Sequence, residues 1–245
     1  AETPRQADFT LALLSKFFNW CEREEVRALN SNPVKHVERL HDARGRERFL
    51  TAAEMERLGA ALVANEARHP QIVALVRLLI FTGCRLNEIV TLRWADVDAD
   101  NAVLNLPDSK TGKKQVFLPA PALKVLESLP RIEGNPYVIA GRREGGRFNG
   151  AQKAWQRLRG EARLDDVRLH DLRHSYASSG VSGGVPLQIV GKLLGHRDTR
   201  TTQIYAHLHD SPVRRAAEKI SGQIAASLSG KQGAVIPMKR AASRK

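Results

Sequence analysis

Residues 71–118 read QIVALVRLLIFTGCRLNEIVTLRWADVDADNAVLNLPDSKTGKKQVFL, and this stretch changes its hydrophobic pattern twice. Residues 71–81 are apolar on nearly every side, which is typical of a buried central helix. Gly83 is suited to close that helix, and a second short helix is expected over residues 85–92. Apolar residues then flank the polar segment Pro107–Lys114, a pattern that predicts a β-hairpin. The stretch therefore predicts helices packed beside a small antiparallel sheet.

Helical patterns continue on both sides of this stretch. Thr51 and Glu54 form a T-x-x-E capping box, which opens a helix at Ala52 that we expect to reach Glu66. Further helices are expected over residues 9–29, 121–129, 149–162, 170–180, 186–194, 199–208 and 212–228. The predicted fold class is therefore mostly α, in the α+β sense, with one small antiparallel β-hairpin or sheet.

The composition indicates a partner that carries many negative charges. The chain has 245 residues and a formal net charge of +13, with a pI near 10.3. The longest apolar stretch, Ile72–Phe81, contains Arg77 and is too short to span a bilayer, so nucleic acid is favoured over a membrane. The cysteines, Cys21 and Cys84, form no CxxC motif or Cys/His cluster, which argues against a disulfide framework or a zinc site.

Two segments carry residues that suit phosphate chemistry. Arg85 follows the expected helix stop directly, and Glu88 lies three residues on, close enough to orient it. A surface arginine with a local ion pair is an equally good interpretation of that segment alone. His170 and Arg173 are three residues apart on an expected helix, so both could touch one phosphate. The HxxR pattern is short, however, and occurs often by chance.

A third segment contains a candidate nucleophile. His196 follows Gly195, which allows close approach of the backbone, and Tyr205 lies nine residues after His196. A single tyrosine in a helix usually packs half-buried with its hydroxyl bonded. Judged by itself, this segment does not separate a packing residue from a nucleophile.

Taken together, four stretches resemble the tyrosine recombinases, enzymes of the phage-integrase type. They are TGCRLNEIVTLRWADVD (82–98), SKTGKKQVFLP (109–119), HDLRHSYASSGV (170–181) and LLGHRDTRTTQIYAHL (193–208). The resemblance covers roughly residues 45–210, with the pieces in the family's order. It implies the helical catalytic domain of that family, and enzymes that cut and rejoin DNA at specific sites.

The resemblance implies a set of residues that bind the scissile phosphate. Arg85 and Arg173 would clamp it and stabilise the charge that builds on its oxygens. His196 would donate a hydrogen bond to a non-bridging oxygen. Glu88 would support these groups without reacting.

The resemblance also implies which residues move protons and attack. Lys110, placed as the family's lysine is in SKTGK, would protonate the leaving 5′ oxygen, although Lys113 and Lys114 lie nearby. His170 would serve as the acid/base near the nucleophile. Tyr205 would attack phosphorus to form a 3′-phosphotyrosyl linkage, without a metal, ATP or another cofactor.

The same resemblance suggests the domain organisation and the partners. Residues 1–44 would be the C-terminal end of a core-binding domain that binds DNA, with a linker, because the first helix, which Asn32-Pro33 should stop, resembles the last helix of that domain. Residues 45–228 would be the catalytic domain with its C-terminal helix, and residues 229–245 a basic flexible tail. Double-stranded DNA would be the partner, with a homotetramer on synapsed DNA and a monomer in solution. A cytoplasmic protein of bacterial or phage origin, with no membrane partner, is expected.

Two rival functions remain at this stage. A type IB topoisomerase would use a similar site to relax DNA, and a non-catalytic DNA-binding protein could keep the same scaffold. Several further residues receive structural interpretations. Tyr137 and Tyr176 are expected to pack, and His174, His207 and His209 to lie on helix surfaces or support the site.

Overall fold

The computed structural model describes residues 4–38, 48–109, 112–196, 200–206, 221 and 224. The chain divides into two compact units, residues 1–46 (unit 1) and residues 47–245 (unit 2). The predicted helix 212–228 lies outside the described residues, apart from Ser221 and Ile224, which are both helical. The predicted tail 229–245 also lies outside them. None of the described helices is long and apolar enough to cross a bilayer.

The first helix of unit 1, α1 (Pro4–Arg23), differs from the predicted range 9–29 at both ends. A proline fits the first turn of a helix because its missing N–H needs no partner there. The helix ends early because the chain reverses after Arg23: the Val26 N–H bonds back to the Cys21 carbonyl at 2.9 Å, and Glu25 has a φ of 59°. The prediction that Asn32-Pro33 stops this helix is therefore wrong.

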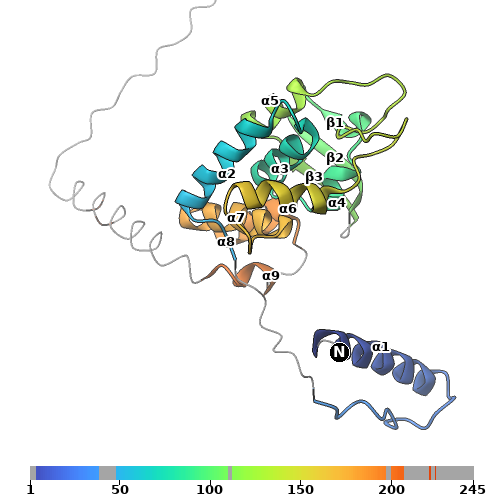
Figure 1. The fold of residues 1–245 in the computed structure, drawn as a ribbon. Helices are drawn as coiled ribbons and strands as arrows, with labels where there is room; N and C mark the ends of the chain where they lie inside the picture. Colours follow the sequence, from blue (N-terminus) through green and yellow to red (C-terminus); the bar gives the residue numbers. More distant parts are fainter. Residues whose placement is uncertain are drawn as a thin grey trace, which may run out of the picture. The chain divides into compact units, whose positions relative to one another are not determined.

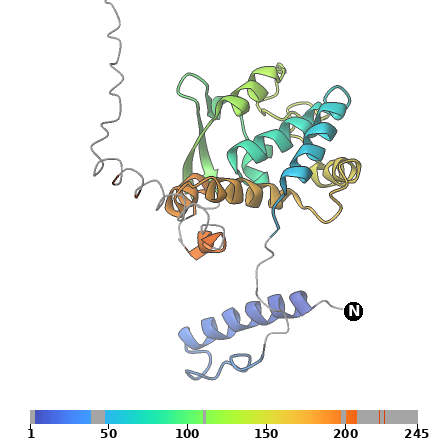
Figure 2. The same cartoon turned by 90° about the vertical axis from the view of Figure 1, so that its left-hand side faces the viewer.

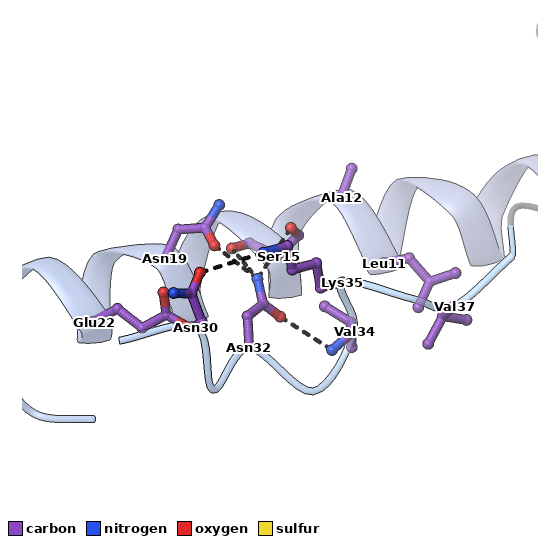
Figure 3. Close-up of a pocket in the computed structure, with 10 residues that line it drawn as sticks. All are labelled: Leu11, Ala12, Ser15, Asn19, Glu22, Asn30, Asn32, Val34, Lys35 and Val37. Carbon is purple, nitrogen blue, oxygen red and sulfur yellow. Dashed lines mark hydrogen bonds between the residues drawn. The ribbon is translucent and has the colours of Figure 1, made fainter. Parts of the chain in front are cut away.

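Asn32 instead ties the returning segment to α1 (Figure 3). Its amide nitrogen donates to Asn19 Oδ1 at 2.8 Å and to the Ser15 carbonyl at 3.3 Å, and its amide oxygen accepts from the Val34 N–H at 3.0 Å. Elsewhere on α1, the large apolar side chains of Phe9, Leu13, Phe17 and Trp20 are exposed within the described residues. Unit 1 therefore presents an apolar surface along its helix.

Unit 2 is built around one buried helix. Its helices are α2 (Ala52–Asn65), α3 (Pro70–Thr82), α4 (Leu86–Val90), α5 (Ala120–Ser128), α6 (Ala151–Glu161), α7 (Leu169–Ser182), α8 (Leu187–Leu194) and α9 (Arg200–Gln203), with a 3-10 turn at Trp94–Asp96. Helix α3 lies in the middle and contacts α2, α5, α6 and α7 (Figure 1). The buried central helix predicted over residues 71–81 is confirmed, since α3 is buried on most sides.

The sequence signals at the helix ends work as expected. Thr51 and Glu54 form the predicted capping box of α2, with the Glu54 N–H donating to Thr51 Oγ1 at 3.3 Å and the Thr51 N–H donating to Glu54 Oε2 at 2.8 Å. Gly83 caps α3 with a φ of 64°, a left-handed conformation that costs glycine little. A Cβ at Gly83 would lie 2.6 Å from Cδ1 of Tyr176, so this helix end also packs too closely for a side chain.

The sheet has three strands, β1 (Val97–Asp98), β2 (Val103–Ser109) and β3 (Gly112–Phe117). They run antiparallel in the order β1-β2-β3, with Leu104 opposite Val116. The predicted hairpin is confirmed as β2 and β3, whereas β1 was not predicted because two residues are too few to show alternation. The fold class predicted from sequence, mostly helical with a small antiparallel sheet, is thus confirmed.

The buried residues form one main core and one small cluster. The main core joins α2–α7 to the sheet, and its large, fully buried side chains include Leu75, Leu78, Leu79, Ile89, Leu104, Trp155 and Leu172. The small cluster contains Ala177 and Val181 of α7, Val190 and Leu194 of α8, and Tyr205. It packs the end of α7 against α8 and Tyr205, and α9 lies beside α8 (Figure 2).

Candidate active site

Arg85 is fixed at the point where α3 gives way to α4. Its backbone N–H donates to Glu88 Oε2 at 2.8 Å, and its guanidinium Nη1 donates to Glu88 Oε1 at 2.9 Å. Glu88 thus caps α4 and holds the arginine side chain at once. The Glu88 side chain is only 4% exposed, against 23% for Arg85, so the arginine keeps access to solvent while its partner is buried.

Arg173 comes from α7 and reaches the same place. Helix α7 begins where Asp171 accepts the Arg168 N–H at 2.8 Å, which sets the turn from which Arg173 projects. Arg173 is buried, and it donates through Nη1 to the Gly83 carbonyl at 2.5 Å and through Nη2 to the Leu194 carbonyl at 2.8 Å. Both carbonyls belong to C-terminal ends of helices, where the helix dipole favours a cation.

Lys114 of β3 is a member of this site, although it was not among the predicted site residues. Its ammonium donates to Glu88 Oε2 and to the Leu194 carbonyl, each at 3.3 Å, and its side chain is 7% exposed. The signal was present in the alternation of β3, because Lys114 shares the inward face with buried Val116. The selected lysine, Lys110, lies outside the described residues.

Arg85, Glu88, Lys114 and Arg173 form what we call the Glu88 cluster. Burial raises the pKa of Glu88. The hydrogen bond from the Arg85 N–H and the charges of Lys114 and Arg85 lower it by more, so the pKa of Glu88 falls below its usual range. Burial and the charge of Arg85 lower the pKa of Arg173, although a guanidinium stays protonated in proteins. Two cations, Arg85 and Lys114, bond to the one carboxylate, and Arg173 adds a third positive charge. The cluster is left with excess positive charge for an anionic ligand.

His196 stands beside the cluster at the end of α8. Gly195 caps α8 with a φ of 69°, and a Cβ there would lie 2.9 Å from Lys114 Cε. His196 Nδ1 is 2.9 Å from Thr202 Oγ1. Burial, then the charges of the neighbouring cations, lower the pKa of His196 to about 4, so the ring is neutral at pH 7. If Nδ1 accepts from Thr202, Nε2 carries the hydrogen and can donate to a ligand.

Tyr205 was predicted to lie within a helix over residues 199–208, but in the described residues it does not. Helix α9 ends at Gln203, and Tyr205 occupies the following turn, where its N–H donates to the Thr202 carbonyl at 3.1 Å. Its side chain is 5% exposed, and its hydroxyl is hydrogen-bonded to Nδ1 of His174. Burial raises the pKa of Tyr205 to about 12, against the opposing effect of Arg173, so the hydroxyl is protonated at neutral pH.

The two histidines of α7 are placed differently from each other. His170 is exposed in the first turn, while Arg173, predicted to share its face, is buried. Residues three apart are about 60° apart around a helix, enough to separate an exposed from a buried side. His174 is half-buried, and its ring centroid is 5.0 Å from that of His170 in an edge-on contact. Its spacing of four from His170 was the available signal for this contact.

A second cationic region lies at the other end of α3. A hollow of about 780 Å³ is lined there by residues from the α2–α3 connection, the segment before α6, and α6 itself. Its cationic lining residues, all exposed, are Arg68, Arg142, Arg143, Arg147, Lys153 and Arg157. None of the described residues lining this basic hollow is an aspartate or a glutamate.

Comparison with known proteins identifies the family. The family model described as the phage integrase family matches residues 48–211, about two thirds of the chain. The chain belongs to the phage integrase family. The match begins at Arg48 and therefore contains every described residue of the Glu88 cluster, His196 and Tyr205.

Curated relatives of this phage integrase domain are DNA recombinases. The shufflon-specific DNA recombinase of Escherichia coli is 30% identical over 201 residues, which cover 81% of this chain and 50% of the relative. A tyrosine recombinase of Thermosipho africanus is 29% identical over 228 residues, covering 89% of this chain and 78% of the relative. The chain thus spans half the length of the first relative and more of the second.

Solved structures of integrases and recombinases share the fold. The crystal structure of XerA recombinase has a TM-score of 0.58 and 28% identity, covering 70% of this chain and 65% of that one. The Tn1549 transposon integrase, solved in complex with circular intermediate DNA, has a TM-score of 0.68, covering 88% of this chain and 79% of that one. Its identity is 16%, so this second likeness concerns the fold alone.

Proposed function

We propose that this chain is the catalytic part of a tyrosine recombinase, which cuts and rejoins DNA at specific sites through a covalent phosphotyrosine at Tyr205. The observation that carries the proposal is the Glu88 cluster. Its three cations meet beside a neutral histidine, His196, and Arg173 is close enough to lower the pKa of Tyr205. Membership of the phage integrase family supports the same conclusion.

The cleavage step uses the cluster as a phosphate site. The phenolic hydroxyl of Tyr205 gives up its proton to a neighbouring base as its oxygen attacks phosphorus, a new P–O bond to tyrosine forms, and the bond to the 5′ oxygen breaks. Arg85 and Arg173 stabilise the charge on the non-bridging oxygens, and His196 donates a hydrogen bond to one of them. Lys110 protonates the leaving 5′ oxygen. Attack by a 5′ hydroxyl on the phosphotyrosine reverses every bond change, so resealing needs neither metal nor ATP.

The same proposal assigns partners to the remaining surfaces. Double-stranded DNA is the substrate, and the basic hollow contacts its phosphates outside the cleavage site. Residues 1–44 are the end of a DNA-binding domain, whose other helices would bury the exposed side chains of Phe9, Phe17 and Trp20. Four protomers assemble on synapsed DNA in the cytoplasm, while the free protein is a monomer.

A nicked suicide duplex tests the proposal. Duplexes tiled across the DNA that flanks the gene, each nicked so that the strand end diffuses away after cleavage, are incubated with the protein in EDTA. We expect a covalent band on a denaturing gel with the wild type and none with Tyr205→Phe, while the matched control Tyr137→Phe keeps the band. A band that survives in Tyr205→Phe would remove Tyr205 as the nucleophile.

The rival functions give different outcomes in the same experiment. A non-catalytic DNA-binding protein would retard the duplex on a native gel but give no covalent band on any tile. A type IB topoisomerase would form adducts and relax supercoiled plasmid, but would not exchange strands between two duplexes. Strand exchange between two sites that both give adducts is the result expected of a recombinase.

A further inference from the structure

His174 is the described residue that touches the reacting atom of Tyr205. Its Nδ1 is hydrogen-bonded to the Tyr205 hydroxyl, and the two rings are 5.9 Å apart between centroids at an angle of 50°. His170, to which the family resemblance gives the acid/base role, is instead exposed and contacts the edge of the His174 ring. The contact with the nucleophile thus lies one helical turn beyond the expected histidine.

The charge states fix the direction of this hydrogen bond. Burial and the neighbouring charge of His170 lower the pKa of His174, so its ring is neutral at pH 7. The hydroxyl of Tyr205, with its raised pKa, remains protonated. Tyr205 therefore donates and Nδ1 of His174 accepts, which places the imidazole hydrogen on Nε2. A neutral imidazole that already accepts from the nucleophile is the arrangement that general-base catalysis requires.

We propose that His174, rather than His170, positions the Tyr205 hydroxyl and accepts its proton as the phenolic oxygen attacks phosphorus. The inference rests on the proposed function of Tyr205. In cleavage the O–H bond of Tyr205 breaks, its proton moves to His174 Nδ1, the P–O bond to tyrosine forms and the P–O5′ bond breaks. In resealing His174 returns the proton to the departing phenolic oxygen, so the histidine ends each cycle neutral.

The groups around His174 determine how long the protonated ring can persist, and most of them disfavour it. The titratable groups that face it, or that share electrostatic interactions with it, are His170, Asp171 and Arg173 of α7, His196 at the end of α8, and Tyr205 after α9. The charges of His170 and Arg173 disfavour the protonated ring, while Asp171 favours it. His170 is exposed and contacts the ring of His174, so it can pass the proton on to solvent. His170 thereby keeps a role, but a secondary one.

The test compares His174→Asn with His174→Ala, because asparagine places an amide atom near the position of Nδ1 and cannot take up a proton at neutral pH. Adduct formation is measured in single turnover on a nicked duplex with the normal 5′ oxygen and on one with sulfur in its place. The sulfur leaves as a thiolate and needs no proton. We expect both variants to slow adduct formation about 10²-fold or more on both duplexes, since general-base loss is not corrected by a better leaving group.

The pH profile separates proton transfer from positioning. The wild-type rate should fall below pH 6.5, as His174 becomes protonated and can no longer accept, and the position of this acid limb should follow the lowered pKa. The rate of adduct formation by His174→Asn should be low and should not change with pH over this range. Wild-type rates in His174→Asn would overturn the proton-acceptor role. A far larger loss in His170→Ala than in His174→Ala would restore His170 to that role.

A readout that needs no activity keeps this inference separate from the proposed function. Nitrogen NMR of ring-labelled histidine should show His174 with unprotonated Nδ1 and protonated Nε2. Tyr205→Phe should move the Nδ1 signal, while Tyr176→Phe, a matched change on α7 itself, should not. If the wild type forms no adduct but the signal moves as expected, the proposed function fails and the contact stands. An unmoved signal would overturn the contact, even in an active enzyme.

Discussion

The Glu88 cluster and the basic hollow are both positively charged, but they hold their charges in opposite ways. In the cluster, side chains that are 4–23% exposed bond to one carboxylate or to carbonyls at the ends of α3 and α8. In the hollow, six cations are exposed, and no carboxylate is among the described residues that line it. The two regions lie at opposite ends of α3.

The difference shows what each arrangement can do. A buried cation must recover its lost hydration through fixed partners, and those partners also fix its direction. Fixed donors can act on charge that develops at one phosphate oxygen. Exposed cations attract any polyanion over about 10 Å at ordinary ionic strength, without selecting one orientation. The cluster is therefore suited to chemistry and the hollow to holding the DNA backbone.

The largest effect is expected from Arg173→Lys. Lysine keeps the charge, but one ammonium cannot replace the planar fork that bonds the Gly83 and Leu194 carbonyls. Adduct formation in single turnover should fall about 10²-fold or more. The matched change Arg143→Lys in the hollow should leave the rate within about twofold. Equal losses in the two variants would remove the distinction between the regions.

A smaller effect is expected from Glu88→Gln on stability. Glutamine fits the space but leaves Arg85 and Lys114 without their shared negative charge, at a cost of about 1–3 kcal/mol in the free energy of unfolding near pH 7. Urea unfolding measures this cost. The matched change Glu127→Gln on α5, an exposed position, should cost less than about 0.5 kcal/mol.

The contribution of Glu88 to stability should decrease as the pH falls, and Glu88→Gln tests this. The folded pKa of Glu88 lies below its usual value of 4.5, so the unfolded chain takes up a proton first as the pH falls. The contribution of Glu88 is complete above pH 4.5 and is lost as the pH falls through the folded pKa. Wild type and Glu88→Gln should therefore approach each other in stability below pH 4.5. A constant difference down to that folded pKa would show that Glu88 is not ionised in the fold.

Much of the fold could be predicted because the sequence patterns that determine it are local. The capping box of α2, the glycine stop of α3 and the alternation of β2 and β3 each depend on residues close in the sequence. The end of α1 could not be predicted in this way, since the helical pattern of apolar residues continues past Arg23. The reversal places Asn32 against α1, where it bonds to Asn19, and a contact thirteen residues apart leaves no local pattern in the sequence.

The sequence suggested candidate residues for the site, but it did not reveal the contacts between them. Arg85 and Glu88 lie within one turn, so their bond follows from spacing. Lys114 and His174 take their importance from the distant segments they meet, at residue 194 and residue 205, and a single sequence contains no record of those contacts. Tyr205 was expected within a helix because the pattern does not reveal that α9 ends at Gln203.

A double-mutant cycle compares the connectivity of the two regions directly. Glu88→Gln and Lys114→Met remove two partners of one ion pair, so their effects on the free energy of unfolding should be coupled by about 0.5–3 kcal/mol. In the hollow, Arg142→Gln and Arg147→Gln should add within about 0.5 kcal/mol. Urea unfolding of all the single and double variants measures both couplings. Additive effects in the cluster would show that its bonds act independently.

The smallest effect on stability, and the clearest on binding, is expected in the basic hollow. Replacing Arg142, Arg143 and Arg147 by glutamine should change the free energy of unfolding by less than about 0.5 kcal/mol for each residue, because exposed side chains contribute little. If these residues contact phosphates, each lost contact should reduce the slope of log K against log salt by about 0.9.

Fluorescence anisotropy of a labelled duplex, titrated at several salt concentrations, measures that slope. Lys124→Gln on α5 supplies the control, since it removes an exposed charge outside the hollow. It should change the slope less than one substitution in the hollow does. If one substitution at Lys124 lowers the slope as much as one substitution in the hollow, the effect belongs to net charge. A larger effect per residue in the hollow, with adduct formation at saturating DNA unchanged, would place phosphate contacts there, away from the Glu88 cluster.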